Sequence, residues 1–210
     1  MRTEEFEMNR KIGIIASCVN VVAVVFFALS MLFRFNFGSY FLSMFIAFSF
    51  VVVMCSYAFY AENRRKVAGL VAAAFSVVYA AIILLVYFAQ LTVVRNGNLT
   101  LQAADLLDFQ KAGLMFDYDL LGYGMMALSA FFAGLTIEPS GKADKLLKAL
   151  LCIHGVFFVS CLLLPMLGIF RTDTPDWIGI AVLEFWCVYF CPIGILSALH
   201  FANKEGGCDN

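Results

Sequence analysis

Two carboxylates, Asp117 and Asp119, stand at the start of a long apolar run that ends near Ile137. A carboxylate at the edge of a membrane helix can bind a ligand or a proton, or act as an acid or base. A helix N-terminus also favours carboxylates through capping and through the helix dipole, which is a sufficient structural reason for both residues. Their role in ligand binding therefore depends on whether they share a vestibule with other acids.

Glu184 lies deeper, about 10 Å past Trp177 along the last apolar run at a helical rise of about 1.5 Å per residue. A charged carboxylate at membrane depth costs roughly 2.5–3.5 kcal/mol, so we expect Glu184 to face the bundle interior and to have a polar partner. The partners that the sequence offers are Arg171, Arg34, Gln90 and Tyr123. Two interpretations stay open: a structural, ion-paired glutamate, and a glutamate that binds a ligand or a proton.

His154 sits in another apolar run, at a depth where a neutral imidazole can relay protons or bind a ligand. Helical rise places a few polar groups of other runs near the same depth: Asn20, Ser76, Ser129 and Cys191. For these residues we favour ordinary hydrogen bonds between helices, worth around 0.6 kcal/mol per contact. The candidate ligand-binding residues are Glu184, Asp119, Asp117, Arg171 and His154, and no catalytic residue is assigned.

Metal and cofactor sites have little support in the sequence. Its seven cysteines include no C-x-x-C pair, and its two histidines are too few for the usual histidine-rich membrane metal sites. The sequence also lacks the serine-hydrolase elbow, the zinc-protease motif and the P-loop. We therefore expect no metal and no cofactor.

The composition identifies an integral membrane protein. Of 210 residues, 63% are hydrophobic and 14% are charged, whereas soluble domains are about half apolar and a quarter charged. The apolar residues form long runs that are nearly free of charge, as transmembrane helices require.

These runs predict the fold class: an all-α, polytopic membrane protein built as one domain, 1–210, from six transmembrane helices. The predicted helices cover 12–33, 38–60, 67–94, 118–137, 146–170 and 177–201. Between the third and the fourth, residues 101–109 mix apolar and acidic side chains and predict a short helix along the membrane interface. Pro165 predicts a kink in the fifth helix.

The distribution of lysine and arginine predicts the orientation. Ten of the fourteen basic residues fall at the termini and in the loops on the same side of the membrane as the termini. Because basic loops stay in the cytoplasm, both termini are predicted to be cytoplasmic. The opposite side is acidic, and its acids are Asp105, Asp108, Asp117, Asp119, Asp173 and Asp176.

The second half of the chain resembles a known family. The stretch from Phe116 to Gly124, the run from Ala127 to Leu135, and Leu150 to Gly155 are similar to a widespread family of uncharacterised six-helix bacterial membrane proteins. The resemblance implies a bacterial inner-membrane protein, and it supplies no catalytic residues.

The leading functional hypothesis is a non-enzymatic protein of the inner (cytoplasmic) membrane that binds or moves a small or lipid-like ligand. It rests on an outward-facing acidic vestibule formed by Asp117, Asp119, Asp173, Asp176 and Glu184. One alternative is an intramembrane lipid-modifying enzyme that uses Glu184 and Asp119 as acid and base. Another is a structural subunit of a membrane complex. Membrane lipids are the expected partners, nucleic acid is not, and the oligomeric state is left open.

Overall fold

The computed structural model describes residues 2–169 and 176–204. In these residues all regular structure is helical, and six helical stretches are long and apolar enough to cross a membrane. They are Phe6–Leu32, Asn36–Tyr60, Asn63–Val94, Leu114–Thr136, Lys142–Met166 and Trp177–Ala202. The six-span, all-helical prediction is confirmed.

The helices agree with the predicted ranges to within a few residues, apart from the first, which begins near the start of the chain, and the fifth, which is divided. Their bounds are α1 Arg2–Leu32, α2 Asn36–Tyr60, α3 Lys66–Ala89, α4 Leu101–Leu107, α5 Leu114–Thr136, α6 Lys142–His154, α7 Val156–Met166 and α8 Asp176–Ala202. A π-helical segment, Gln90–Val94, prolongs α3, and short 3-10 turns cover Asn63–Arg65 and Phe109–Lys111.

The fifth membrane span breaks at Gly155 into α6 and α7, which the sequence analysis did not predict. Around Gly155 the backbone forms short-range hydrogen bonds, from Gly155 N to Cys152 O at 3.2 Å and from Phe158 N to Gly155 O at 3.1 Å. A Cβ atom at Gly155 would lie 2.9 Å from the Cβ of Phe131, so the absence of a side chain lets this turn lie against α5. Pro165, the predicted kink, instead lies in the last turn of α7.

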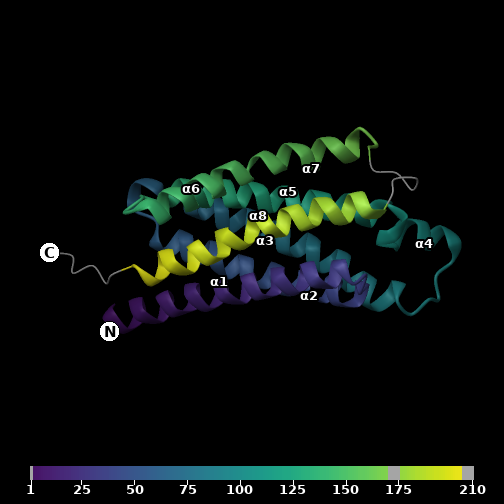
Figure 1. Cartoon of the computed structure of the whole chain (residues 1–210), viewed down its shortest axis with the longest axis horizontal. Coiled ribbons are helices and arrows are strands. Elements are labelled where there is room, and N and C mark those ends of the chain that lie inside the picture. Colours follow the sequence, from purple (N-terminus) through teal and green to yellow (C-terminus); the bar gives the residue numbers. More distant parts are fainter. Residues whose placement is uncertain (1, 170–175, 205–210) are drawn as a thin grey trace.

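The helices form a ring in which α8, α1, α2, α3 and α5 pack in that order. Within the described residues α6 closes the ring by packing on both α5 and α8, whereas α7 packs on α5 and meets α8 only near its start, where the Phe157 and Tyr189 rings are 5.8 Å apart. The ring is therefore complete in one half of the bundle and open between α7 and α8 in the other. The start of α1 and the end of α8 lie at the closed end, and α4 lies at the opposite end (Figure 1).

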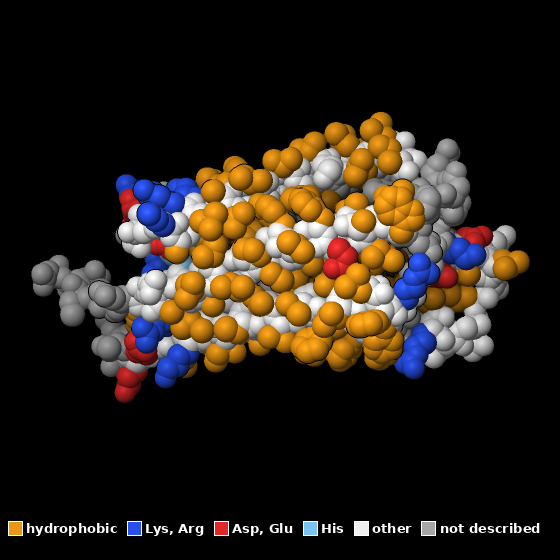
Figure 2. All heavy atoms as spheres, in the orientation of Figure 1, with side chains coloured by type: hydrophobic (Ala, Val, Ile, Leu, Met, Phe, Trp, Pro, Cys, Tyr) orange, Lys and Arg blue, Asp and Glu red, His pale blue; other side chains and the backbone are white. Residues whose placement is uncertain are grey.

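The surface carries a broad belt of hydrophobic side chains between two charged ends (Figure 2). We call the end with the termini the basic end and the end with α4 the loop end.

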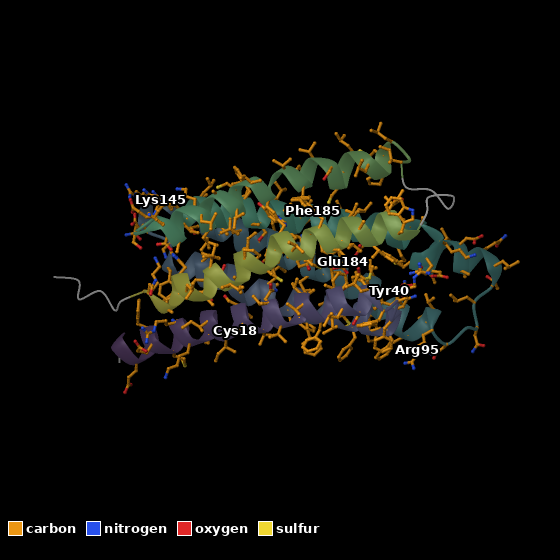
Figure 3. The ribbon with its side chains drawn as sticks, viewed as in Figure 1. Cys18, Tyr40, Arg95, Lys145, Glu184 and Phe185 are labelled. Carbon is orange, nitrogen blue, oxygen red and sulfur yellow. The ribbon has the colours of Figure 1, made fainter. Side chains whose placement is uncertain are left out.

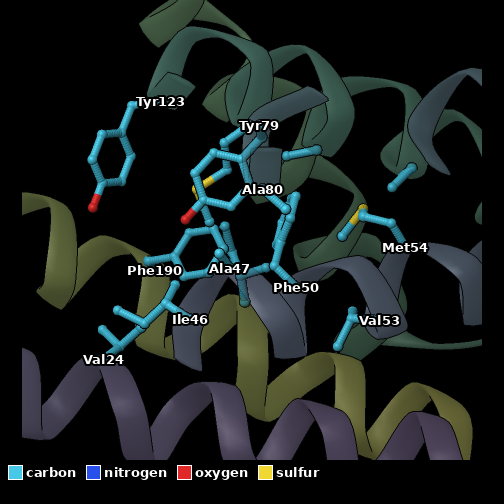
Figure 4. Packing of buried hydrophobic residues seen from close by; sticks show 14 of the residues in the cluster. Val24, Ile46, Ala47, Phe50, Val53, Met54, Tyr79, Ala80, Tyr123 and Phe190 are labelled. Carbon is cyan, nitrogen blue, oxygen red and sulfur yellow. The ribbon is translucent and has the colours of Figure 1, made fainter. Parts of the chain in front are cut away.

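Large side chains fill the closed half of the bundle. Phe50, Tyr79 and Phe190 are each at most 2% exposed and converge there from α2, α3 and α8 (Figure 4). The ring centroids of Phe50 and Tyr79 are 5.4 Å apart in an edge-to-face arrangement, which aromatic pairs favour. This packing separates the basic end from the space described below.

The loop end is organised by α4, the predicted interfacial helix. Thr100 caps its N-terminus by accepting a hydrogen bond from Ala103 N at 3.3 Å. Gln90 then ties the loop to α3: its Nε2 donates to Leu107 O at 2.7 Å and its Oε1 accepts from Phe109 N at 3.0 Å. Gln90 is therefore committed to positioning the loop.

Candidate functional site

A cavity of about 400 Å³ opens in the loop-end half of the bundle. Its walls come from α1 and the α1–α2 connection, from α2, α3 and α5, from the loop after α4, from the end of α6, and from α7 and α8. The size falls within the range of about 300–1,000 Å³ that is usual for small-molecule sites. The cavity therefore lies where the ring of helices is incomplete.

Asp119 lies on the cavity wall and is only 4% exposed. The Tyr87 hydroxyl lies beside its carboxylate. The oxygen Oδ1 is buried and has no hydrogen-bond partner among the described residues, and Asp119 forms no ion pair with them. Because buried polar groups in native proteins are nearly always paired, an unpaired carboxylate oxygen on a cavity wall indicates a missing partner.

Tyrosines surround this carboxylate. Tyr79, Tyr87 and Tyr123 are buried side chains from α3 and α5 that interact electrostatically with Asp119. The Tyr79 and Tyr123 rings lie 5.9 Å apart, and each hydroxyl oxygen is buried without a well-formed hydrogen bond among the described residues, although the Tyr87 hydroxyl lies beside that of Tyr123. The wall beside Asp119 is therefore aromatic and carries polar atoms that are free to bind.

His154 and Trp186 form the deeper part of the cavity. Trp186 Nε1 donates a hydrogen bond to His154 Nε2 at 3.2 Å, and His154 Nδ1 has no partner among the described residues. An indole nitrogen can only donate, so Nε2 of His154 must be the unprotonated nitrogen. The proton of the neutral imidazole then sits on Nδ1.

We predict that His154 is present at neutral pH as the Nδ1–H tautomer. Selective ¹⁵N labelling of histidine should give one resonance pair typical of this tautomer for His154, assigned by its loss in His154→Gln. A pair typical of the Nε2–H form would contradict the hydrogen bond from Trp186.

Helical rise gives the depth of these groups. Asp119 is five residues from the start of α5 at Leu114, or about 7 Å into the bundle. His154 is twelve residues from the end of α7 at Met166, or about 18 Å in. The cavity therefore reaches from the loop end to about the middle of the membrane.

The side between α7 and α8 is the open one. Val182 lines the cavity and is 52% exposed, and a Cβ atom at Gly179 would have nothing within 4 Å. No residue of α7 is buried. Among the described residues, this side of the cavity is therefore the least covered one.

The structure separates the residues that the sequence analysis grouped together. Asp119 and His154 line the cavity, whereas Asp117 is exposed and is not part of its wall. Arg171 and Asp173 lie outside the described residues, and so does the side chain of Asp176.

Glu184 does not line the cavity, contrary to the expected acidic vestibule. It is half-buried, and its Oε1 has no hydrogen-bond partner among the described residues. Figure 3 labels it on α8, at the place where Figure 2 shows an acidic side chain within the apolar belt. Glu184 is therefore only partly accessible at the lipid-facing surface, its Oε1 is buried, and its expected interior partner is not found in the described part of the chain.

Three residues of the expected polar layer, Asn20, Ser76 and Ser129, form structural hydrogen bonds. Asn20 Nδ2 joins α1 to α2 by donating to Ser49 Oγ at 2.9 Å and to Ile46 O at 3.2 Å. Ser129 Oγ joins α5 to α3 by donating to Ala72 O at 2.7 Å, and Ser76 Oγ bonds within its own helix. Interhelical bonding is confirmed for Asn20 and Ser129.

Sequence reasoning missed the aromatic part of the site. Tyr87, Tyr123 and Trp186 line the cavity, yet only Tyr123 was considered, as a partner for Glu184. The available signal was the occurrence of tyrosine and tryptophan inside apolar runs, because their polar atoms need a partner when buried.

Comparisons with protein-family models, with curated proteins and with solved structures give no match, so the site is interpreted from its own geometry.

Proposed function

We propose that this protein binds a lipid-like, amphipathic ligand in the cavity between α5, α7 and α8. The observation that carries the proposal is the gathering of unpaired polar atoms at one apolar cavity. Of the six buried atoms without a partner among the described residues, three line the cavity: Asp119 Oδ1, Tyr123 Oη and His154 Nδ1. A fourth, Tyr79 Oη, belongs to the tyrosine whose aromatic ring lies 5.9 Å from that of Tyr123.

The arrangement of polar and apolar groups favours an amphipathic molecule. Arg34, Asn36 and Gln110 are exposed side chains that line the mouth at the loop end. Deeper in, the lining is mostly aromatic and aliphatic, and the open side between α7 and α8 adjoins the lipid. A ligand with a polar head and an apolar body matches this gradient, since each part then meets surroundings of its own kind.

The packing favours binding over free passage. The cavity ends at His154 and Trp186, and the ring centroids of Trp186 and Phe190 lie 4.9 Å apart in a stack below it. Moving a ligand to the basic end would require this aromatic core to repack. The protein is therefore proposed to hold its ligand in the half of the membrane nearest the loop end.

The enzyme alternative loses its proposed acid–base pair. Asp119 lines the cavity and Glu184 does not, so the two carboxylates do not share this site. No observation in the described residues favours a lipid-modifying reaction over binding.

The basic end is proposed to face the cytoplasm, and the membrane is proposed to be the inner membrane of a bacterium. The distribution of lysine and arginine supports the cytoplasmic position of the basic end. The resemblance of the second half of the chain to six-helix bacterial membrane proteins supports the assignment to a bacterial inner membrane.

The proposal predicts that filling the open side with Gly179→Leu abolishes ligand binding and preserves the fold. The new side chain enters open space, and leucine is a better helix former than glycine, so stability should hold or rise. The measurement is the lipid that co-purifies with each variant, quantified by mass spectrometry, together with the thermal shift on adding that lipid back.

The matched control is Gly141→Leu, which also adds leucine in open space, but at the basic end, away from the cavity. Parent and control should retain the same bound lipid, whereas Gly179→Leu should lose it. Equal retention by Gly179→Leu would count against the cavity as the binding site.

A further inference from the structure

Asp119 is a buried acid with no positively charged partner beside it among the described residues. Among the described residues that line the cavity, Arg34 is the one with a permanent positive charge, and it is exposed at the mouth. The other basic residue, His154, accepts a hydrogen bond from Trp186 and lies about 11 Å deeper than Asp119 by helical rise. Asp119 is buried about 7 Å into the bundle by helical rise and pairs with no cation there. An ionised carboxylate in such a place is costly unless a positive group accompanies it.

The walls around this carboxylate have the composition of a cation site. The aromatic side chains on the lining are Phe27, Tyr40, Tyr87, Phe109, Phe116, Tyr123, Phe157 and Trp186. The Tyr40 and Tyr87 ring centroids are 5.4 Å apart, and those of Tyr123 and Trp186 are 5.4 Å apart. The faces of such rings attract ammonium groups, tryptophan most strongly, and the attraction grows when water is excluded.

We infer that the ligand carries an amine or quaternary ammonium group that binds between Asp119 and the aromatic walls. The inference rests on the proposed ligand site and names its chemical class. An ammonium group supplies the charge that Asp119 lacks and uses the ring faces that a neutral or anionic head leaves unused. An anionic head would have to approach an unpaired carboxylate.

Trp186 offers a direct reading of occupancy, because it lines the cavity and is 6% exposed. The protein has two tryptophans, and the other, Trp177, is 64% exposed. In a Trp177→Phe background all tryptophan fluorescence therefore reports on the cavity.

The experiment titrates this background, in nanodiscs of uncharged lipid, with three probes that share a chain: octyltrimethylammonium, octanol and octanoate. Each titration follows the change in Trp186 emission and gives a binding affinity. The affinity of octyltrimethylammonium is expected to be at least about tenfold higher than that of octanol. Octanoate is expected to bind more weakly than octanol. The signal should vanish in Gly179→Leu for every probe.

Asp119→Asn separates the charge from the shape of the site. Its ammonium affinity should fall to that of octanol, while octanol binding stays unchanged. Asp119→Glu, which keeps the charge, should retain the ammonium preference. The three-probe series in the parent tests the inference even if neither variant folds.

Two failures are distinguishable. Saturable octanol binding that equals or exceeds ammonium binding in the parent would overturn the inference and leave the proposed function standing. The absence of saturable binding by all three probes would overturn both.

Discussion

Replacing Gly69 with alanine is expected to lower the free energy of unfolding by about 2 kcal/mol. A Cβ atom at this position would lie 2.7 Å from the Cα of Ala58 and 3.3 Å from its Cβ. The first of these atoms belongs to the backbone of α2 and cannot rotate away, so α2 and α3 must move apart. Thermal unfolding in mild detergent measures the effect.

The sign of this effect is diagnostic. In the interior of a helix, glycine to alanine normally stabilises by roughly 0.5–1 kcal/mol, because the unfolded chain loses freedom. Gly179→Ala is the control, since a Cβ there meets nothing within 4 Å, and it should be neutral or stabilising. If Gly69→Ala were as stable as Gly179→Ala, the close approach of α2 and α3 would be contradicted.

Replacing Asp144 with alanine is expected to cost about 3 kcal/mol, within the range for removing one partner of a buried polar pair. Asp144 Oδ1 lies 2.8 Å from His200 Nδ1, which connects α6 to α8 in the closed half of the ring. Its Oδ2 accepts from Ser140 Oγ at 2.7 Å and from Ser140 N at 3.1 Å. One side chain thus holds the α5–α6 turn and the helix that completes the bundle.

Two controls refine this prediction. Asp144→Asn keeps an oxygen at the acceptor position and should cost less than Asp144→Ala. Asp117→Ala removes an exposed aspartate on α5 and should change stability by no more than about 0.5 kcal/mol. An equal loss in Asp144→Ala and Asp117→Ala would mean that the contact between Asp144 and His200 contributes nothing.

The consequence for binding follows from the position of this pair. α6 and α7 form one membrane span, and α6 is the part that packs on α8. Loss of the contact between Asp144 and His200 should therefore loosen the packing of the helices in the closed half of the bundle. This loosening should extend to the cavity in the loop-end half. Weaker ligand binding in Asp144→Ala would be a secondary effect, whereas in Gly179→Leu it is expected without loss of stability.

The sequence alone determined the six spans, the common side of the termini and the short helix after the third span. These features depend on the length of apolar runs and on where charge interrupts them, and both are local properties of the chain. The break at Gly155 was missed because a single glycine in an apolar run does not by itself end a helix. It ends one here because the backbone lies against Phe131 of α5.

Only the tertiary structure decided which acids face the cavity. Asp117 and Asp119 are two residues apart, or about 200° around a helix, so packing lets one point inward and leaves the other exposed. The same spacing separates Glu184 from Trp186: α8 buries Trp186 on the cavity wall against α5 and α6, whereas Glu184 lies off that wall and is half-buried. Hydropathy gives the depth of a residue, but its direction depends on how each helix is turned about its axis, which the contacts between helices fix.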